Sequence, residues 1–307
     1  MTDSLSPTYV GRFAPTPSGP LHFGSVVAAV GSFLDARRQR GVWLLRIDDV
    51  DRPRSVPGAA DDILRTLERL GLAWDGAPVW QHERVDRYEA ALAQLVDSGA
   101  VYGCACTRRQ LQDGNRAADG SVIYPGTCAA GLAPGVAPRA WRFRVPASVV
   151  RFDDRVQGVI VEDLRRDVGD FVLKRADGLF AYQLATVVDD ADAGVTDVVR
   201  GIDLMLSTPR QIALQQALGL STPRYGHFPV VVDAAGQKLS KQSLARAVHA
   251  FPPTQLVFDA LCCLGQTPPD ELVTAPLSEL WQWALAHWSM QAVPRVGEVT
   301  SRSDYDR

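Results

Sequence analysis

The chain has 307 residues, of which 46% are hydrophobic and 22% are charged, and its net charge is −3. These values favour a folded protein with a packed core over a disordered one, and a pI of about 6.0 argues against a uniformly basic nucleic-acid-binding surface. The sequence contains no run of 18 apolar residues and its first ten residues lack the pattern of a secretory signal, so we expect a cytoplasmic protein without a membrane span.

The first hundred residues alternate between apolar strand patterns and amphipathic helix patterns. Strands are predicted over residues 8–15 and 42–47, and helices over residues 24–41, 57–72 and 84–99. An alternation of strand and helix in this order is typical of a parallel α/β sheet.

The pattern changes near residue 100. Residues 101–180 carry glycine and proline clusters between three short β-like runs, at residues 140–145, 158–164 and 171–175. This composition predicts an inserted α+β module.

The α/β pattern returns after the insertion. A strand pattern at residues 196–204 precedes a helix pattern at residues 208–219, and residues 227–248 indicate a hairpin-like element, a loop and a helix. Two short helical segments follow the FPP of residues 251–253, and the polar tail at residues 301–307 is expected to fray.

The stretch RFAPTPSGPLHFGS, residues 12–25, connects the first strand pattern to the first helix pattern. Backbone N–H groups at a helix N-terminus favour a phosphate, and Gly19 and Gly24 permit its close approach. We expect His22 to direct a ring N–H at such an anion. The prolines stiffen the loop: Pro15, Pro17 and Pro20. Taken alone, the stretch also fits an ordinary turn.

A second segment, KLSKQ at residues 238–242, reads alone as a solvated basic loop. With HFGS, however, it resembles the paired HIGH and KMSKS signatures of the class I aminoacyl-tRNA synthetases. RFAPTPSGPLHFG and RIDDVDRPRS resemble the glutamyl and glutaminyl branch of that family in particular. The resemblance covers roughly residues 8–290. Asp48 stands where that branch usually carries Glu, and Ser25 takes the variable fourth place of the first signature.

The resemblance implies activation of an amino acid by ATP with Mg²⁺. Its catalytic residues would be His22, Lys238 and Lys241. The residues that it assigns to ATP are Pro15, Gly19, His22, Gly24, Ser25 and Lys241. The residues that it assigns to L-glutamate are Arg12, Phe13, Ala14, Pro15, Thr16, Asp48, Tyr182 and Arg200. Arginine suits the side-chain carboxylate of glutamate and Asp48 suits its ammonium group.

Three of the five cysteines, Cys104, Cys106 and Cys128, lie within 25 residues of one another. In a chain without an export signal this spacing fits a structural zinc site, although three reduced cysteines without a metal fit it too. No histidine between His82 and His227 can supply a fourth ligand. The pattern C-x-C…Y-x3-C resembles the zinc module of one synthetase subfamily, which implies that Tyr124 is the fourth ligand.

Only 65 residues follow the KLSKQ segment, which is too few for the helical anticodon-binding domain of a glutamyl-tRNA synthetase. The combination of features resembles the glutamyl-Q tRNA(Asp) synthetase family, whose members transfer glutamate to queuosine in the tRNA(Asp) anticodon. That role needs a local basic face, for which we name Arg108, Arg109 and Arg116. Two alternatives remain open: a truncated glutamyl-tRNA synthetase that charges a tRNA 3′ end, and a non-catalytic RNA-binding module.

We therefore expect an α/β fold with three parts. Residues 1–100 and 181–250 would form a Rossmann-like parallel-sheet catalytic domain, residues 101–180 an inserted zinc-containing α+β module, and residues 251–307 a short helical C-terminal segment. The expected partners are ATP, L-glutamate and the queuosine-bearing anticodon arm of tRNA(Asp), with no membrane, and the expected oligomeric state is a monomer.

Overall fold

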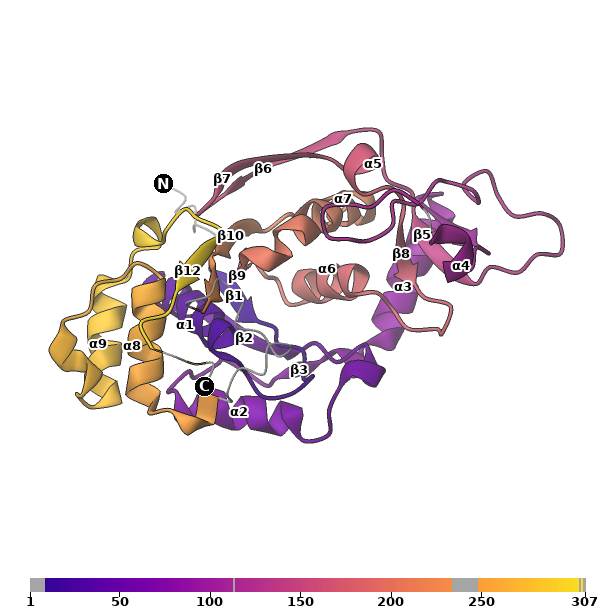
Figure 1. Cartoon of the computed structure of the whole chain (residues 1–307). Coiled ribbons are helices and arrows are strands. Elements are labelled where there is room, and N and C mark those ends of the chain that lie inside the picture. The colour runs from indigo at the N-terminus through magenta and orange to yellow at the C-terminus, as the bar shows by residue number, and fades with distance from the viewer. Residues whose placement is uncertain (1–8, 113, 234–247, 304, 306–307) are drawn as a thin grey trace, which may run out of the picture.

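The structure is a computed structural model that describes residues 9–112, 114–233, 248–303 and 305. Its centre is a group of parallel strands (Figure 1): β1 (Val10–Phe13), β2 (Val42–Ile47), β3 (Val79–Trp80), β9 (Asp197–Gly201) and β10 (Arg224–Phe228). β2 pairs in parallel with β1 and β3, and β9 pairs in parallel with β10. The backbone N–H of Thr196 donates to the carbonyl of Val10 at 2.9 Å, so β9 lies beside β1. This arrangement confirms the predicted parallel α/β sheet.

Helices cover these strands: α1 (Phe23–Arg38), α2 (Ala59–Arg69), α3 (Val85–Asp97), α6 (Tyr182–Asp192) and α7 (Thr208–Leu218). Among them, α1 packs on β1, β2 and β9. Its fully buried residues include Val26, Val30 and Leu34, which recur at the helical spacing of four. The helix begins at Phe23, after the loop that follows β1.

The chain between β3 and α6 contains a second set of strands. β4 (Val101–Cys104), β5 (Ala140–Phe143) and β8 (Phe171–Lys174) form an antiparallel sheet. β6 (Val149–Asp154) and β7 (Gly158–Asp163) form an antiparallel ribbon. Two one-turn helices lie here too: α4 (Arg108–Leu111) and α5 (Leu164–Asp167). In Figure 1 the ribbon runs along the top of the molecule and the sheet lies at the right with α4.

The C-terminal part contains α8 (Pro253–Cys263), α9 (Leu277–His287) and a strand that the sequence did not indicate, β12 (Glu298–Thr300). β12 pairs in parallel with β11 (Val230–Val232). Among the residues for which a hairpin-like element, a loop and a helix were predicted, 227–248, the described strand β11 therefore pairs outside the segment, with β12. A single residue, Pro229, separates β10 from β11, which is too short a connection for a two-residue hairpin turn. The helix predicted within residues 234–247 lies outside the described residues.

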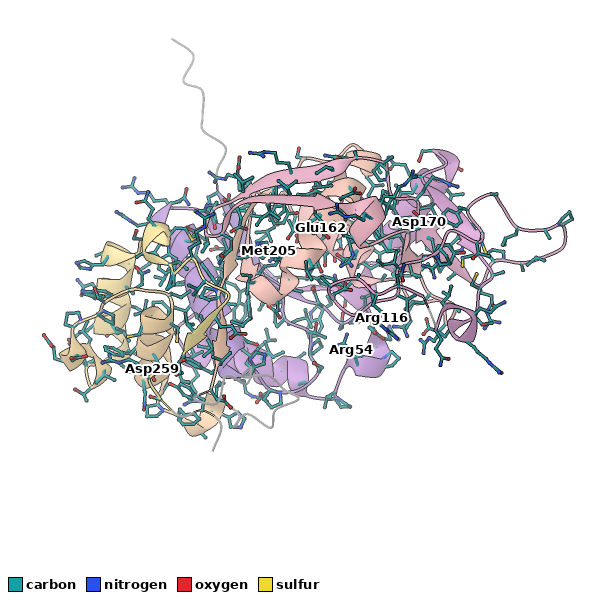
Figure 2. All side chains as sticks on the ribbon, turned by 45° about the horizontal axis from the view of Figure 1, so that its top comes forward. Arg54, Arg116, Glu162, Asp170, Met205 and Asp259 are labelled. Carbon is teal, nitrogen blue, oxygen red and sulfur yellow. The ribbon has the colours of Figure 1, made fainter. Side chains whose placement is uncertain are left out.

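The polar tail was expected to fray, but Tyr305 is buried with an exposed fraction of 1%. Its ring stacks on Phe23 at the start of α1, with ring centroids 4.0 Å apart, and meets the ring of Phe251 at 4.8 Å. Its hydroxyl donates to Asp259 of α8 at 2.7 Å. Asp259 is labelled in Figure 2, on the C-terminal helices. The frayed tail was thus a wrong expectation at this residue, because an aromatic ring with a buried acceptor outweighs the polar residues around it.

Short 3₁₀ turns connect these elements: Arg52–Arg54, Gln81–Glu83, Ile202–Ser207, Val248–Ala250, Asp270–Val273 and Met290–Ala292. Among the helices of the described residues, none is long and apolar enough to cross a lipid bilayer.

Candidate active site and metal centre

The loop after β1 ends at a histidine that caps α1. The backbone N–H of Ser25 donates to Nδ1 of His22 at 3.2 Å, while Nε2 of His22 and Oγ of Ser25 are 3.0 Å apart. A ring nitrogen that accepts must carry its lone pair, so this cap places the ring proton of neutral His22 on Nε2. The ring therefore lies at the N-terminus of the 16-residue helix α1, where free backbone N–H groups and the helix dipole favour an anion.

Backbone hydrogen bonds tie this loop to the segment that follows β2. The N–H of Asp48 donates to the carbonyl of Pro15 at 3.0 Å, and that of Val56 donates to the carbonyl of Pro17 at 2.8 Å. Gly19 has a φ of 137°, which other residues rarely adopt. The loop is thus held at both sides, and Gly24 follows it in the first turn of α1.

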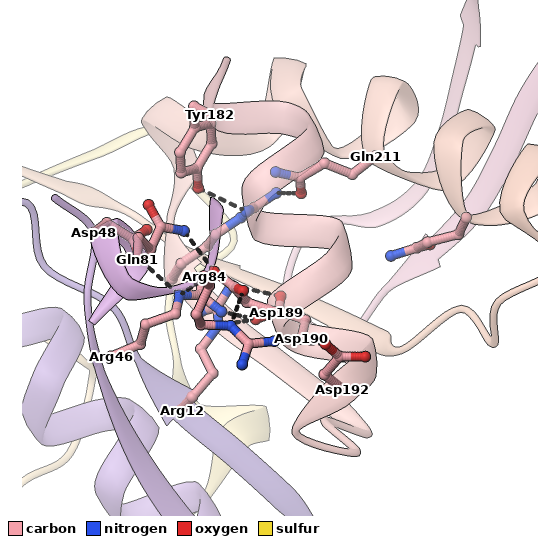
Figure 3. A network of polar contacts seen from close by, with 12 residues as sticks. Arg12, Arg46, Asp48, Gln81, Arg84, Tyr182, Asp189, Asp190, Asp192 and Gln211 are labelled. Atoms are coloured by element: carbon pink, nitrogen blue, oxygen red, sulfur yellow. Dashed lines mark hydrogen bonds and ion pairs between the residues drawn. The ribbon is translucent and has the colours of Figure 1, made fainter. Parts of the chain in front are cut away.

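Four buried charged side chains form an ion network between β1, β2 and α6 (Figure 3). Arg12 donates to both carboxylate oxygens of Asp190, at 3.2 and 3.3 Å. Arg46 donates through Nε to Asp48 at 2.6 Å and through Nη1 to Asp190 at 2.5 Å. Nη2 of Arg46 is buried and has no hydrogen-bond partner among the described residues. The network therefore holds both predicted residues, Arg12 and Asp48, and retains one unused buried donor.

Burial and charge act in opposite directions on the two carboxylates of this network. Burial raises the pKa of Asp48 above its ordinary value, although Arg46 opposes that change. Burial also disfavours ionised Asp190, but the guanidinium groups of Arg12 and Arg46 together hold its pKa below the ordinary value. Asp190 is thus the firmly ionised partner that keeps two arginines in place.

A second layer of polar contacts joins the network to α3. Asp189, the neighbour of Asp190 on α6, accepts from Gln81 at 2.8 Å, from the Tyr88 hydroxyl at 2.8 Å and from Arg84 at 2.5 Å. Asp189 also lies 3.7 Å from Nε of Arg46, so these two consecutive aspartates join α6 both to β2 and to the start of α3.

Arg200, at the end of β9, is almost fully buried and its guanidinium is held on several sides. Nη1 donates to the hydroxyl of Tyr182 at 3.3 Å. Nη2 donates to Thr208 and to Gln211, each at 2.8 Å. Nε lies 3.2 Å from Nε2 of His227. Tyr182 at the start of α6 and Arg200 near the end of β9, both predicted for the glutamate site, are thus in direct contact.

The remaining predicted residues have different positions. Phe13 is buried and stacks on Trp43 at 6.2 Å between ring centroids, so its ring belongs to the core. Ala14 and Thr16 lie in the loop between β1 and α1. Lys238 and Lys241 lie outside the described residues.

The three cysteines predicted to bind a metal do come together, with all three Sγ atoms within 4.8 Å of one another. Sγ of Cys104 and Sγ of Cys106 each lie 3.5 Å from the hydroxyl of Tyr124, and Sγ of Cys128 lies 3.6 Å from Sγ of Cys106. Burial opposes the thiolate of Cys128, but hydrogen bonds from Tyr124 and the Ala105 backbone lower its pKa to about 7.

Three thiols, which are soft donors, converge with one phenol oxygen at these distances and together supply the four donors of a tetrahedral zinc site. Outside the cluster, the Arg142 guanidinium lies over the Tyr124 ring, 3.9 Å from its centroid, where it fixes the ring plane. The residues therefore fit a zinc ion.

Sequence reasoning missed several residues of the arrangement. Asp190 and Arg46 carry the ion network, and His227, Thr208 and Gln211 hold Arg200. The adjacent acidic pair at residues 189 and 190 within an apolar helix was a detectable signal, because such charges are rarely buried without a partner. The pairing of His227 with Arg200 had no local signal.

Comparisons with known proteins agree with this geometry. Residues 9–271 match the family model of the catalytic domain of class I tRNA synthetases for E and Q. A glutamyl-Q tRNA(Asp) synthetase of Aromatoleum aromaticum is 60% identical over 96% of this chain and 93% of its own length. One from Dechloromonas aromatica is 54% identical over 95% of this chain and 97% of its own length.

The fold is also that of a solved synthetase. The crystal structure of a glutamate–tRNA synthetase from Elizabethkingia anophelis superposes with a TM-score of 0.78, at 24% identity, over 95% of this chain and 68% of that one. The family match, the near full-length relatives and this fold lead to one conclusion: the chain belongs to the glutamyl-Q tRNA(Asp) synthetase family of class I tRNA synthetases.

Proposed function

We propose that the protein activates L-glutamate with ATP and transfers the glutamyl group to the queuosine base in the anticodon of tRNA(Asp). In the first step a carboxylate oxygen of glutamate bonds to the α-phosphorus of ATP, and the bond to the bridging oxygen breaks to release pyrophosphate. In the second step a hydroxyl oxygen of the queuosine cyclopentene ring bonds to the glutamyl carbonyl carbon. AMP leaves and the hydroxyl proton is released. The observation that carries the proposal is 60% identity over 96% of the chain to a protein of that name.

The glutamate site lies between the ends of β1, β2 and β9. The residues proposed to form it are Arg12, Phe13, Ala14, Pro15, Thr16, Asp48, Tyr182 and Arg200. Arg200 is held by neutral partners, so its charge is available to a substrate carboxylate, whereas the charge of Arg12 is compensated by Asp190. Asp48 already pairs with Arg46 at 2.6 Å, so in its proposed role it would share its carboxylate between Arg46 and the ammonium of glutamate. The Asp side chain is one methylene shorter than the usual Glu.

The ATP site is proposed at the N-terminus of α1. It would comprise Pro15, Gly19, His22, Gly24, Ser25 and Lys241, with Mg²⁺ held mainly by phosphates and water. To donate to a phosphate oxygen, the Nε2 N–H of His22 would exchange its present neighbour, Oγ of Ser25 at 3.0 Å, for that oxygen. Lys238 and Lys241 would add positive charge where negative charge develops on the phosphate oxygens. Charge stabilisation of this kind carries most of the catalysis of phosphoryl transfer.

We propose one structural zinc ion held by Cys104, Cys106, Tyr124 and Cys128. When bound, it would cross-link β4 to the loop that carries Tyr124 and Cys128. The convergence of the four donor groups supports it.

The RNA would approach over a locally basic surface. Arg108, Arg109 and Arg116 are exposed in the inserted module, and Arg54, another exposed arginine, lies beyond β2 (Figure 2). Phosphate contacts by such residues would make binding weaken with salt. The truncated glutamyl-tRNA synthetase is not favoured, because curated relatives that match nearly the whole chain bear the glutamyl-Q name.

We also propose that the polypeptide is divided into three parts. Residues 1–100 and 181–250 would be the catalytic domain, residues 101–180 the zinc module and residues 251–307 the C-terminal segment. The antiparallel sheet of β4, β5 and β8 supports the second part. The pairing of β12 with β11 ties the third part to the first. We also propose that the protein is a monomer.

The first test is glutamate-dependent ATP–pyrophosphate exchange without tRNA. We expect exchange with L-glutamate and none with L-glutamine, because a pocket built for a carboxylate leaves a charge unpaired when an amide occupies it. Absence of exchange with every amino acid would favour the non-catalytic RNA-binding module.

A further inference from the structure

Three buried side chains from separate strands form a hydrogen-bonded chain behind the proposed glutamate site. His227 of β10 is fully buried, and its Nδ1 lies 2.6 Å from Oδ2 of Asp154. On the other side of the ring, Nε2 lies 3.2 Å from Nε of Arg200 and 3.1 Å from Oγ1 of Thr208. These hydrogen bonds therefore connect the ribbon of β6 and β7, through β10, to the end of β9.

The contact with Arg200 determines which ring nitrogen carries the proton. The Nε of an arginine can only donate, so Nε2 of His227 must present its lone pair, and the ring proton must lie on Nδ1, facing Asp154. Burial lowers the pKa of His227, which keeps the ring neutral, as this arrangement requires. The acceptor that faces Nε of Arg200 is thus neutral.

Asp154 is itself fixed by the tight turn between β6 and β7. Its Oδ1 accepts from the backbone N–H groups of Val156 at 3.0 Å, Gln157 at 2.9 Å and His227 at 3.1 Å. The Gln157 side chain then donates to the carbonyl of His227 at 3.0 Å. The ribbon consequently forms hydrogen bonds both to the backbone and to the ring of His227.

The other contacts of Arg200 leave one direction for a ligand. Nη2, with two N–H groups, donates to Thr208 and Gln211 and lies 3.4 Å from the carbonyl oxygen of Leu204, and Nε faces His227. Nη1 also has two N–H groups, of which one reaches the Tyr182 hydroxyl. A substrate carboxylate would therefore accept a hydrogen bond from Nη1 of Arg200, beside Tyr182. His227 contacts the guanidinium at Nε.

We propose that His227 and Asp154 are positioning residues for glutamate recognition: Asp154 fixes the tautomer of His227, and His227 fixes the guanidinium plane of Arg200. This inference rests on the proposed role of Arg200 in binding glutamate. It also assigns a role to the β6–β7 ribbon, since the ribbon supplies Asp154, which orients His227.

Two substitutions at His227 separate positioning from packing. In His227→Gln the amide oxygen can replace Nε2 as an acceptor for Arg200, whereas in His227→Asn the shorter side chain cannot reach it. We expect His227→Asn to raise the KM for glutamate by about tenfold or more, as for the loss of a hydrogen bond to a charged group. His227→Gln should restore most of the affinity, and the KM for ATP should change little in either variant.

Asp154→Asn tests the tautomer with an almost isosteric change. The amide N–H can donate to Nδ1, which moves the ring proton to Nε2, opposite the N–H of Arg200. A rise in the KM for glutamate similar to that of His227→Asn is expected. Asp153→Asn, an exposed neighbour on the same strand, is the matched control and should leave both KM values unchanged.

ATP–pyrophosphate exchange at varied glutamate and varied ATP provides the measurement, with circular dichroism to establish folding. Equal glutamate KM values in wild type, His227→Asn and Asp154→Asn would overturn the inference, and so would equal changes in both KM values. Should one variant fail to fold, the other still decides. Lack of glutamate-dependent exchange in the wild type would instead contradict the proposed function.

Discussion

The burial of Tyr305 predicts that the end of the chain stabilises the start of α1. Tyr305→Ala removes a ring that is stacked on Phe23 at 4.0 Å and a hydroxyl that donates to Asp259 at 2.7 Å. Asp259 also accepts from Ser303 at 2.6 Å, so the aspartate would lose one of two donors. Burial and the contact with Asp259 raise the pKa of Tyr305, so its hydroxyl remains a donor at any ordinary pH.

The expected loss can be divided into two parts. Removal of a buried aromatic side chain costs roughly 3–5 kcal/mol, of which an aromatic pair contributes about 0.5–1.5 kcal/mol. Tyr305→Phe keeps the ring and removes only the hydrogen bond to a carboxylate, which costs about 1.5–3 kcal/mol. We therefore expect a graded loss of stability, with wild type above Tyr305→Phe and Tyr305→Ala lowest.

Urea unfolding followed by tryptophan fluorescence measures this order. Thr300→Ala, at an exposed position in β12, is the control and should unfold as the wild type does. If Tyr305→Ala and Thr300→Ala share the wild-type midpoint, the tail is frayed in solution and the packing of Tyr305 on Phe23 contributes nothing.

Three further predictions concern the metal, the second signature and acid stability. Tyr124→Phe should release zinc to a chelator sooner than the wild type while keeping all three thiols, as metal analysis after dialysis would show; equal retention would remove Tyr124 from the ligand set. Lys241→Ala should fold normally but lose roughly 10²–10³ of its exchange rate, whereas near-normal exchange would contradict its role. Burial lowers the pKa of His227 in the folded protein below its ordinary value of 6.5, so unfolding below that pH takes up a proton. The free energy of unfolding should therefore fall as the pH decreases below 6.5. The pKa of Asp154 is also lowered, and its effect has the same direction at lower pH. His227→Gln should flatten this loss between pH 7 and pH 5.5 in urea unfolding, and an unchanged slope would show that other groups cause it.

The sequence predicts those features that depend on local pattern. The apolar run at residues 42–47 forms β2 with those bounds, and the helix predicted over residues 24–41 forms as α1, because period and glycine placement are local signals. Part of the cysteine cluster was predictable for the same reason, since Cys104 ends β4 and Cys106 follows two residues later.

Features that depend on distant partners were not predictable. β11 resembled half of a hairpin, but its partner β12 lies more than 60 residues further along the chain. Arg12 was recognised as a cation for the site, yet nothing nearby shows that Asp190, 178 residues away, already binds it. Tyr305 looked like part of a polar tail because its acceptor, Asp259, lies on another helix. In each case the deciding energy comes from tertiary contacts, which local propensity does not contain.

The central claim is that glutamate is transferred to the queuosine base and not to a tRNA 3′ end. The most direct measurement is transfer of radiolabelled glutamate to tRNA(Asp) with and without queuosine, each before and after periodate oxidation of the 3′-terminal ribose. We expect labelling of the queuosine-containing tRNA whether or not its 3′ end is oxidised, and none of the tRNA with guanosine in that position. Equal labelling of both tRNAs, or labelling abolished by 3′ oxidation, would contradict the claim and identify a truncated glutamyl-tRNA synthetase instead.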